Sequence, residues 1–150
     1  MGADLTVADR LDLLDLVARY AAEVDARHWD AVAALFTADG ALLTPDPPRS
    51  LTPVAEARGS AAIVGALRRL DGFVLTFHHV TGAVLDSSGP GEATGRATAA
   101  AHHVEQSDPP RSWVWHLVYD DTFTRSPEGW RFSSRALTIR LIESRPIARL

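Results

Sequence analysis

Apolar residues near the start of the chain recur at helical spacing. Between residue 6 and about residue 25 they return every three or four positions, which predicts an amphipathic helix with one buried stripe. Thr6 is a good capping residue for this helix, and Asp9 completes a variant of the capping box. The predicted stripe contains Leu11, Leu14, Val17, Ala18, Ala21 and Val24.

Two shorter helices are predicted next, at residues 29–36 and 61–70. A short strand is expected between them at residues 41–44. Residues 45–58 contain several prolines, which disfavour regular structure. We therefore expect a loop there, and a lid over a site is one role open to it.

From residue 73 onward the chain has the pattern of β-strands. Four segments fit, at residues 73–85, 92–106, 112–125 and 129–142, and short turns rich in Gly, Pro and Ser join them. Helices followed by a long antiparallel sheet predict an α+β fold with the helices packed on one face of the sheet. No repeat or second domain is evident, so we expect one domain over residues 1–150.

Alternation along the strands predicts which histidines face inward. In the second strand, small residues at every other position share a face with His103, so His103 should point inward and His102 outward. The small residues also leave room for a pocket. In the first strand both faces are plausible, and alternation does not choose between His78 and His79.

The third strand has one strongly apolar face, which could be either core or pocket wall. That face carries Trp113, Trp115, Leu117, Tyr119, Asp121 and Phe123.

One carboxylate lies on the predicted apolar stripe of the first helix. Counting back from Asp25 by helical steps gives Ala21, Ala18 and Leu14. A carboxylate in that position needs a partner. Because a buried Asp beside a His is a common proton-transfer unit, the histidines of Thr76-Phe77-His78-His79-Val80-Thr81 are candidates.

The composition excludes several classes of function. The net charge is −4 and the arginines are scattered, so neither nucleic acid nor an anionic membrane surface is an expected partner. There is no cysteine for a disulfide, a thiolate zinc site or a thiol nucleophile. All 15 basic residues are Arg, which excludes Schiff-base and P-loop lysines. No segment has the pattern of a signal peptide or a spanning helix, so a cytoplasmic protein is expected.

Four motifs together resemble a known family. In chain order they are Val24-Asp25-Ala26-Arg27-His28-Trp29-Asp30, Ala34-Leu35-Phe36-Thr37-Ala38-Asp39-Gly40, Thr76-Phe77-His78-His79-Val80 and Gly129-Trp130-Arg131-Phe132. Their order and spacing are similar to those of SnoaL-like proteins of the nuclear transport factor 2-like superfamily, in the branch of scytalone dehydratase and bile-acid dehydratase. The resemblance implies a single SnoaL-like domain folded as a cone-shaped α+β barrel, in which a curved, mostly antiparallel sheet wraps around a pocket plugged by helices. Many members are cofactor-free dehydratases, isomerases or cyclases.

The same resemblance assigns site residues. It places the motif Asp on Asp25, the first-strand His on His78, a second pocket His on His103, and the Tyr of bile-acid dehydratase on Tyr20. For dehydration or isomerisation next to a carbonyl, His78 would be the base, made more basic by Asp25. Tyr20 would donate to the carbonyl or leaving group, and His103 could hold a water or act as the acid. The expected apolar walls, suited to a mostly apolar cyclic ligand, are Val24, Phe36, Trp115, Leu117 and Tyr119.

The chain departs from scytalone dehydratase in two places. That family has a Tyr immediately before its Asp, where this chain has Val24, and its polar third-strand positions fall on Leu117 and Tyr119. Scytalone itself is therefore not the expected substrate. No set of residues matches the Asp-Arg-Asp of the epoxide hydrolase branch, which argues against epoxide opening.

Other interpretations stay open. His78, His103 and Asp25 could form a two-histidine, one-carboxylate metal site, although a base at His78 needs its free lone pair, so we expect no metal and no cofactor. The same fold could serve as a non-catalytic module for ligand binding or dimerisation. We also expect a homodimer through the exposed sheet face, because apolar residues such as Val114 and Val118 lie opposite the aromatic face.

Overall fold

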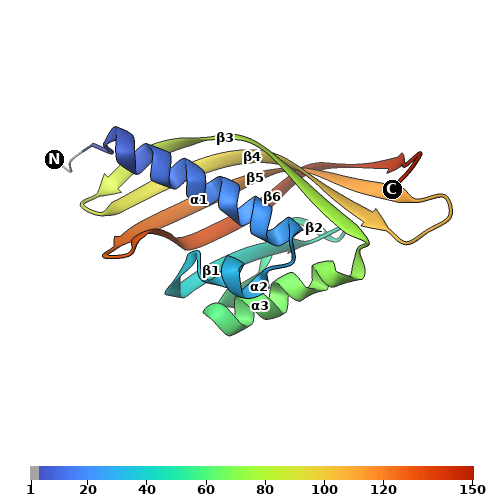
Figure 1. The fold of residues 1–150 in the computed structure, drawn as a ribbon, viewed down its shortest axis with the longest axis horizontal. Helices are drawn as coiled ribbons and strands as arrows, with labels where there is room; N and C mark the ends of the chain where they lie inside the picture. The colour runs from blue at the N-terminus through green and yellow to red at the C-terminus, as the bar shows by residue number, and fades with distance from the viewer. Residues whose placement is uncertain (1–3) are drawn as a thin grey trace.

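The computed structural model describes residues 4–150 as three helices packed against one sheet (Figure 1). The helices are α1, Val7–Asp25; α2, Trp29–Ala33; and α3, Ser60–Leu67, which continues into a 3-10 turn at Arg68–Gly72. The strands are β1, Phe36–Asp46; β2, Ser50–Arg58; β3, Leu75–Gly89; β4, Glu92–Glu105; β5, Arg111–Ser126; and β6, Gly129–Pro146. The predicted α+β class is confirmed.

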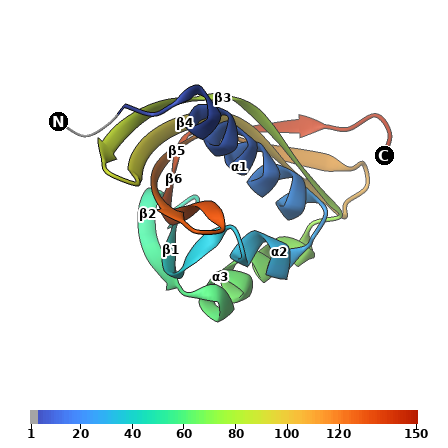
Figure 2. The same ribbon diagram turned by 60° about the vertical axis from the view of Figure 1, so that its left-hand side comes forward.

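The sheet is mixed and open. Its strand order is β2-β1-β6-β5-β4-β3, and every neighbouring pair is antiparallel except β1 and β6, which run parallel. Strands β2 and β3 are the two edges, so the sheet curves without closing into a complete barrel. Figure 2 shows α1 lying in the hollow of the curved sheet, with α2 and α3 on the side of β1.

The capping box predicted at the start of α1 is confirmed. The Thr6 hydroxyl accepts a hydrogen bond from the backbone N–H of Asp9, and the Asp9 carboxylate accepts one from the backbone N–H of Thr6. The same carboxylate also accepts hydrogen bonds from Trp130 and Arg125, so this end of the helix is fixed to the last two strands.

Among the described residues, no helix has the length and apolar character needed to cross a membrane.

The buried stripe of α1 differs from the predicted one. Leu11 and Leu14 were expected inside but are 62% and 38% exposed, and Ala18 is also exposed. Apolar residues cover more than half of the helix circumference, so the pattern alone does not define the buried side. The residues that are buried are Asp9, Leu13, Leu16, Val17, Tyr20, Ala21 and Val24. Asp25 lies beside this stripe, at the last position of the helix.

The expected loop at residues 45–58 is wrong, because β1 and β2 form a hairpin there. Pro45 and Pro53 lie where the strand register shifts, and β2 is an edge strand. An irregular edge pairing tolerates the missing N–H of proline, which a central strand does not. The second helix is also shorter than predicted, since it ends at Ala33 and Phe36 begins β1.

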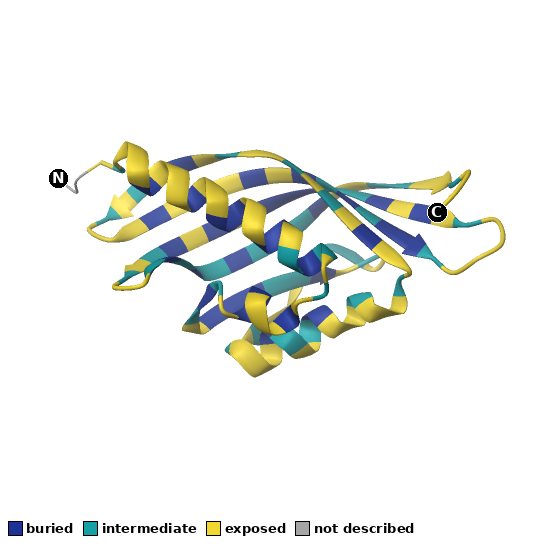
Figure 3. Ribbon diagram, viewed as in Figure 1, coloured by how far each residue is buried: buried dark blue, intermediate teal, exposed yellow. Residues whose placement is uncertain are grey.

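Buried and exposed residues alternate along the long strands of the sheet (Figure 3). This alternation decides which histidines face the hollow of the sheet. In β4, His103 is buried with the small residues of its face, as predicted, and His102 is only partly buried. In β3 the inward positions are Thr76 and His78, whereas His79 is exposed. The choice that alternation left open is therefore made in favour of His78, as the family resemblance implied.

Candidate active site

Asp25 and His78 form a doubly hydrogen-bonded pair. The Nδ1 atom of His78 lies 2.6 Å from Oδ1 of Asp25, and the backbone N–H of His78 donates to Oδ2 at 2.8 Å. The pair forms because α1 ends at Asp25, beside β3, where alternation turns His78 toward the helix. The side chains of Asp25 and His78 are 19% and 6% exposed, so the pair is shielded from bulk water.

The contact with Asp25 determines where the ring proton of His78 lies. An ionised carboxylate can only accept hydrogen bonds, so Nδ1 of His78 carries a proton, and in the neutral form of the ring the lone pair is on Nε2. Partial burial opposes ionisation of Asp25, but hydrogen bonds from the ring and backbone of His78 and from the Thr76 hydroxyl together lower the pKa of Asp25. The carboxylate is therefore charged at neutral pH, and it fixes the orientation of the His78 ring.

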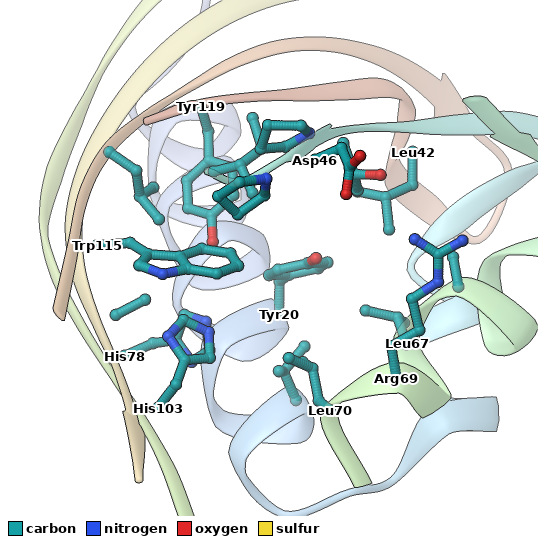
Figure 4. A pocket seen from close by; sticks show the side chains of 18 residues that line it. Tyr20, Leu42, Asp46, Leu67, Arg69, Leu70, His78, His103, Trp115 and Tyr119 are labelled. Carbon is teal, nitrogen blue, oxygen red and sulfur yellow. The ribbon is translucent and has the colours of Figure 1, made fainter. Parts of the chain in front are cut away.

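A cavity of about 280 Å³ opens beside this pair (Figure 4). Most of its wall is apolar, and it is bounded by α1, the end of α3, β1 and the inner faces of the curved strands. This size suits a small cyclic molecule rather than a polymer. The lining residues are Tyr20, Val24, Leu42, Thr44, Pro45, Asp46, Pro47, Ala66, Leu67, Arg69, Leu70, His78, Ala101, His103, Trp115, Leu117, Tyr119 and Leu137.

His103 lies in the same wall but does not bind Asp25. Its ring is 6.2 Å from that of His78 and 4.1 Å from that of Trp115, measured between centroids, and its Nδ1 faces the carbonyl oxygen of Trp113 at 3.4 Å. Burial, together with the nearby His78, lowers the pKa of His103 to about 4. The ring is therefore neutral near pH 7, with Nδ1 donating to the carbonyl and Nε2 left as an acceptor. This state suits holding a water or a hydroxyl group better than acting as an acid.

Two buried tyrosines form the deep wall. Burial raises the pKa of Tyr20 to about 12 and raises that of Tyr119 further, so both phenols keep their protons and can donate hydrogen bonds. The guanidinium of Arg135 lies behind them, 4.4 Å and 4.0 Å from their ring centroids. Arg135 is itself paired with the buried carboxylate of Asp121 through two hydrogen bonds of 2.8 Å. This pair supports the tyrosine rings without lining the cavity.

Most of the predicted wall residues line the cavity. Val24, Trp115, Leu117 and Tyr119 lie in the wall, which identifies the aromatic face of β5 as pocket lining as well as core. Phe36 does not line the cavity, because β1 begins there and its ring packs in the core against Tyr20 and Phe132.

The rim of the cavity was missed by the sequence analysis. Asp46 and Arg69 are its charged residues, and Figure 4 shows Arg69 across the cavity from the two histidines. Asp46 is also paired with Arg49 at 3.2 Å. Asp46 lies in the hairpin of β1 and β2, where the sequence predicts a loop, and Arg69 lies in the 3-10 turn that follows α3.

Within residues 4–150, no three His, Cys, Asp or Glu side chains are grouped so that they could hold a metal ion. The proposed set of His78, His103 and Asp25 does not form such a group, since Asp25 contacts only the first of the two histidines by hydrogen bond.

Several solved structures are similar in fold to this chain. A protein described as a candidate scytalone dehydratase from Novosphingobium aromaticivorans has a TM-score of 0.78 at 23% identity, with 96% of each chain covered. Hexachlorocyclohexane dehydrochlorinase LinA-type3 from Novosphingobium barchaimii has a TM-score of 0.78 at 16% identity, with 96% of this chain and 93% of that chain covered. An NTF2-like protein with a cystatin-like fold from Novosphingobium aromaticivorans has a TM-score of 0.66 at 24% identity, with 89% and 83% covered.

The sequence itself matches one family profile. The profile of the SnoaL-like domain covers residues 5–136, which is most of the chain. No curated protein sequence matches significantly. Identities of this size to the solved structures show a shared fold and leave the reaction open. The profile match identifies the chain as a member of the SnoaL-like domain family, with the NTF2-like fold.

Proposed function

We propose that this protein is a cofactor-independent acid/base enzyme that acts on a mostly apolar cyclic small molecule. The observation that carries the proposal is that His78 lines an apolar cavity while its Nδ1 is held by Asp25. The reaction is a dehydration, an isomerisation or a cyclisation that begins with removal of a proton from a carbon next to a carbonyl.

The cavity supplies the parts that such a reaction needs. His78 takes the carbon-bound proton, and Asp25 stabilises the imidazolium that forms. Tyr20 donates a hydrogen bond to the enolate oxygen or leaving oxygen, because its phenol stays protonated. His103 accepts a hydrogen bond from a substrate hydroxyl or a water. The apolar walls keep bulk water away from the developing charge and strengthen these interactions.

The names of two structural neighbours support an elimination. One is described as a candidate scytalone dehydratase and the other as a dehydrochlorinase. Elimination of water or of hydrogen chloride needs a base that removes a proton from carbon, which is the role proposed for His78. Their low identities to this chain leave its substrate unassigned.

The test is a mass-spectrometric screen of purified protein against cyclic ketones and hydroxy-ketones. The wild-type protein should convert at least one compound to a dehydrated or isomerised product, and His78→Ala should lose about 10²–10⁴-fold in turnover while it remains folded. His79→Ala is the matched control, because His79 is the next residue and points out of the sheet. Equal turnover in wild type and His78→Ala would contradict the mechanism, and tight binding without turnover would favour a carrier or binding module.

A further inference from the structure

The turn that ends α1 has an arginine in a conformation that favours glycine. Arg27 has φ 62°, and its backbone N–H donates to the carbonyl of Val24 at 3.1 Å. The N–H of His28 donates to the carbonyl of Glu23 at 3.0 Å. These two hydrogen bonds define a Schellman motif, in which Arg27 occupies the left-handed position usually taken by glycine. A residue other than glycine has a conformational cost at this position, and the contacts of the Arg27 side chain can offset it.

The side chain of Arg27 is directed toward β3. Its Nη1 donates to the hydroxyl oxygen of Thr76 at 3.1 Å, and its Nη2 donates to the carbonyl oxygen of Phe73 at 3.3 Å. The guanidinium carbon also lies 5.5 Å from the ring centroid of Trp29. Three contacts therefore fix a cation close to the catalytic pair without placing it in the cavity wall.

Thr76 connects this cation to Asp25. The threonine is 1% exposed, and its hydroxyl donates to Oδ1 of Asp25 at 3.0 Å, the same oxygen that accepts the His78 ring proton. A hydroxyl has only one proton. Because Arg27 can only donate to the hydroxyl oxygen, it directs that proton toward Asp25.

We propose that Arg27 and Thr76 are positioning residues, which act through Asp25 to hold its carboxylate charged and oriented so that His78 keeps its proton on Nδ1. Neither residue lines the cavity. The proposal concerns the state of the pair, and only its importance for turnover rests on the proposed function.

Other titratable groups also surround the pair. Tyr20 comes from α1, His103 from β4 and Tyr119 from β5, and all three are neutral near pH 7. Arg27 is a cation that reaches Asp25 through the Thr76 hydroxyl, and Thr76 is the neutral donor that shares an oxygen of Asp25 with His78. Removing either should therefore make ionisation of Asp25 less favourable.

Nuclear magnetic resonance of the free protein tests the proposal. In Thr76→Val and in Arg27→Gly, the pKa of Asp25, followed through its carboxyl carbon, should rise by about half a unit or more. The nitrogen shifts of His78 should show a smaller fraction of the Nδ1-protonated form. Thr76→Ser keeps the hydroxyl and should restore wild-type behaviour.

Two features keep the test decisive. Arg27→Gly relieves the left-handed backbone while removing the guanidinium, so it should fold even if Thr76→Val does not. The matched controls are Thr98→Val, which removes a hydroxyl from the outer face of β4, and Arg19→Ala, which removes an exposed cation of α1 paired with Asp15. Neither control should move the Asp25 titration.

The possible outcomes separate this proposal from the proposed function. If Asp25 has the same pKa in folded Arg27→Gly as in the wild type, and His78 keeps the same tautomer, the positioning role is overturned, whatever the protein catalyses. If the shifts appear but no carbonyl compound is ever turned over, the positioning role stands and the proposed function fails.

Discussion

Asp25 binds His78 through both of its carboxylate oxygens, one to the ring and one to the backbone of the same residue. The two contacts fix the position of the strand residue and the rotation of its ring together. A contact to the backbone alone would leave the ring free to turn about its side-chain bonds, and a contact to the ring alone would not fix the strand residue to the helix. The arrangement holds Nε2 beside the cavity before any ligand enters, which reduces the reorganisation needed in the reaction.

Asp25→Asn should weaken the hydrogen bonding that orients His78 while nearly preserving the shape of the side chain at position 25. The two N–H groups of His78 contact different oxygens of Asp25, so in Asn one of them would face the NH₂ group, which is a donor. We expect the His78 tautomer to change and turnover to fall by about 10²–10⁴-fold. Steady-state kinetics and nitrogen shifts of the same sample check both effects. Wild-type kinetics with an unchanged tautomer would show that the carboxylate is structural.

His103 should make the fold sensitive to mild acid. Its pKa is about 4 in the folded protein and 6.5 when unperturbed, so over this interval the unfolded chain binds a proton that the folded chain does not. The free energy of unfolding should therefore decrease as pH falls from about 6.5 to about 4, by at most about 3 kcal/mol. Urea unfolding across this interval measures the effect. His103→Gln should flatten that part of the dependence, and an unchanged slope would contradict the assignment.

Metal removal should have no effect on activity. A cation bound to Nε2 of His78 would occupy the lone pair that abstracts the proton. We therefore predict no stoichiometric metal in the purified protein and full turnover after treatment with chelators. Elemental analysis that finds about one zinc, iron or manganese per chain, with activity lost on chelation and restored by that ion, would favour the metal mechanism.

A homodimer through the outer face of the sheet stays a prediction, but its apolar contacts must be reassigned. Val114 and Val118 are 1% and 8% exposed in the single chain, so they offer little surface to a partner. Phe77 is 53% exposed and points away from the cavity, which makes it the better candidate. Light scattering should give twice the chain mass of 16.2 kDa, and Phe77→Ser should shift the protein toward monomer. A wild-type monomer at micromolar concentration would exclude this interface.

The inward face could be predicted from the sequence for the regular strand β4, but not for the irregular strand β3. The pairing of β4 with β5 has no register shift along β4, so its period of two correctly placed His103 inward. Strand β3 has a shift between Val80 and Gly82, and the inward set changes parity there. That change explains why alternation alone left His78 and His79 undecided. The edge strand β2 was missed because prolines usually indicate loops.

The positioning residues could not be predicted for a different reason. Nothing in the sequence around Arg27 indicates a left-handed residue, since helices that end this way usually have glycine there. The link from Arg27 to Thr76 spans 49 positions and depends on how α1 packs against β3. Asp25 was found although part of the stripe used to find it is exposed, because the end of the helix still faces the cavity.

Hydrogen–deuterium exchange at carbon tests the central claim most directly, because it detects proton abstraction whatever reaction follows. Cyclic ketones are incubated with the protein in D₂O, and deuterium at the carbon next to the carbonyl is measured by mass spectrometry. Wild type and His79→Ala should both accelerate incorporation into at least one ketone, whereas His78→Ala should be slower by about 10²–10⁴-fold. Equal incorporation by wild type and His78→Ala would contradict the assignment of His78 as the base.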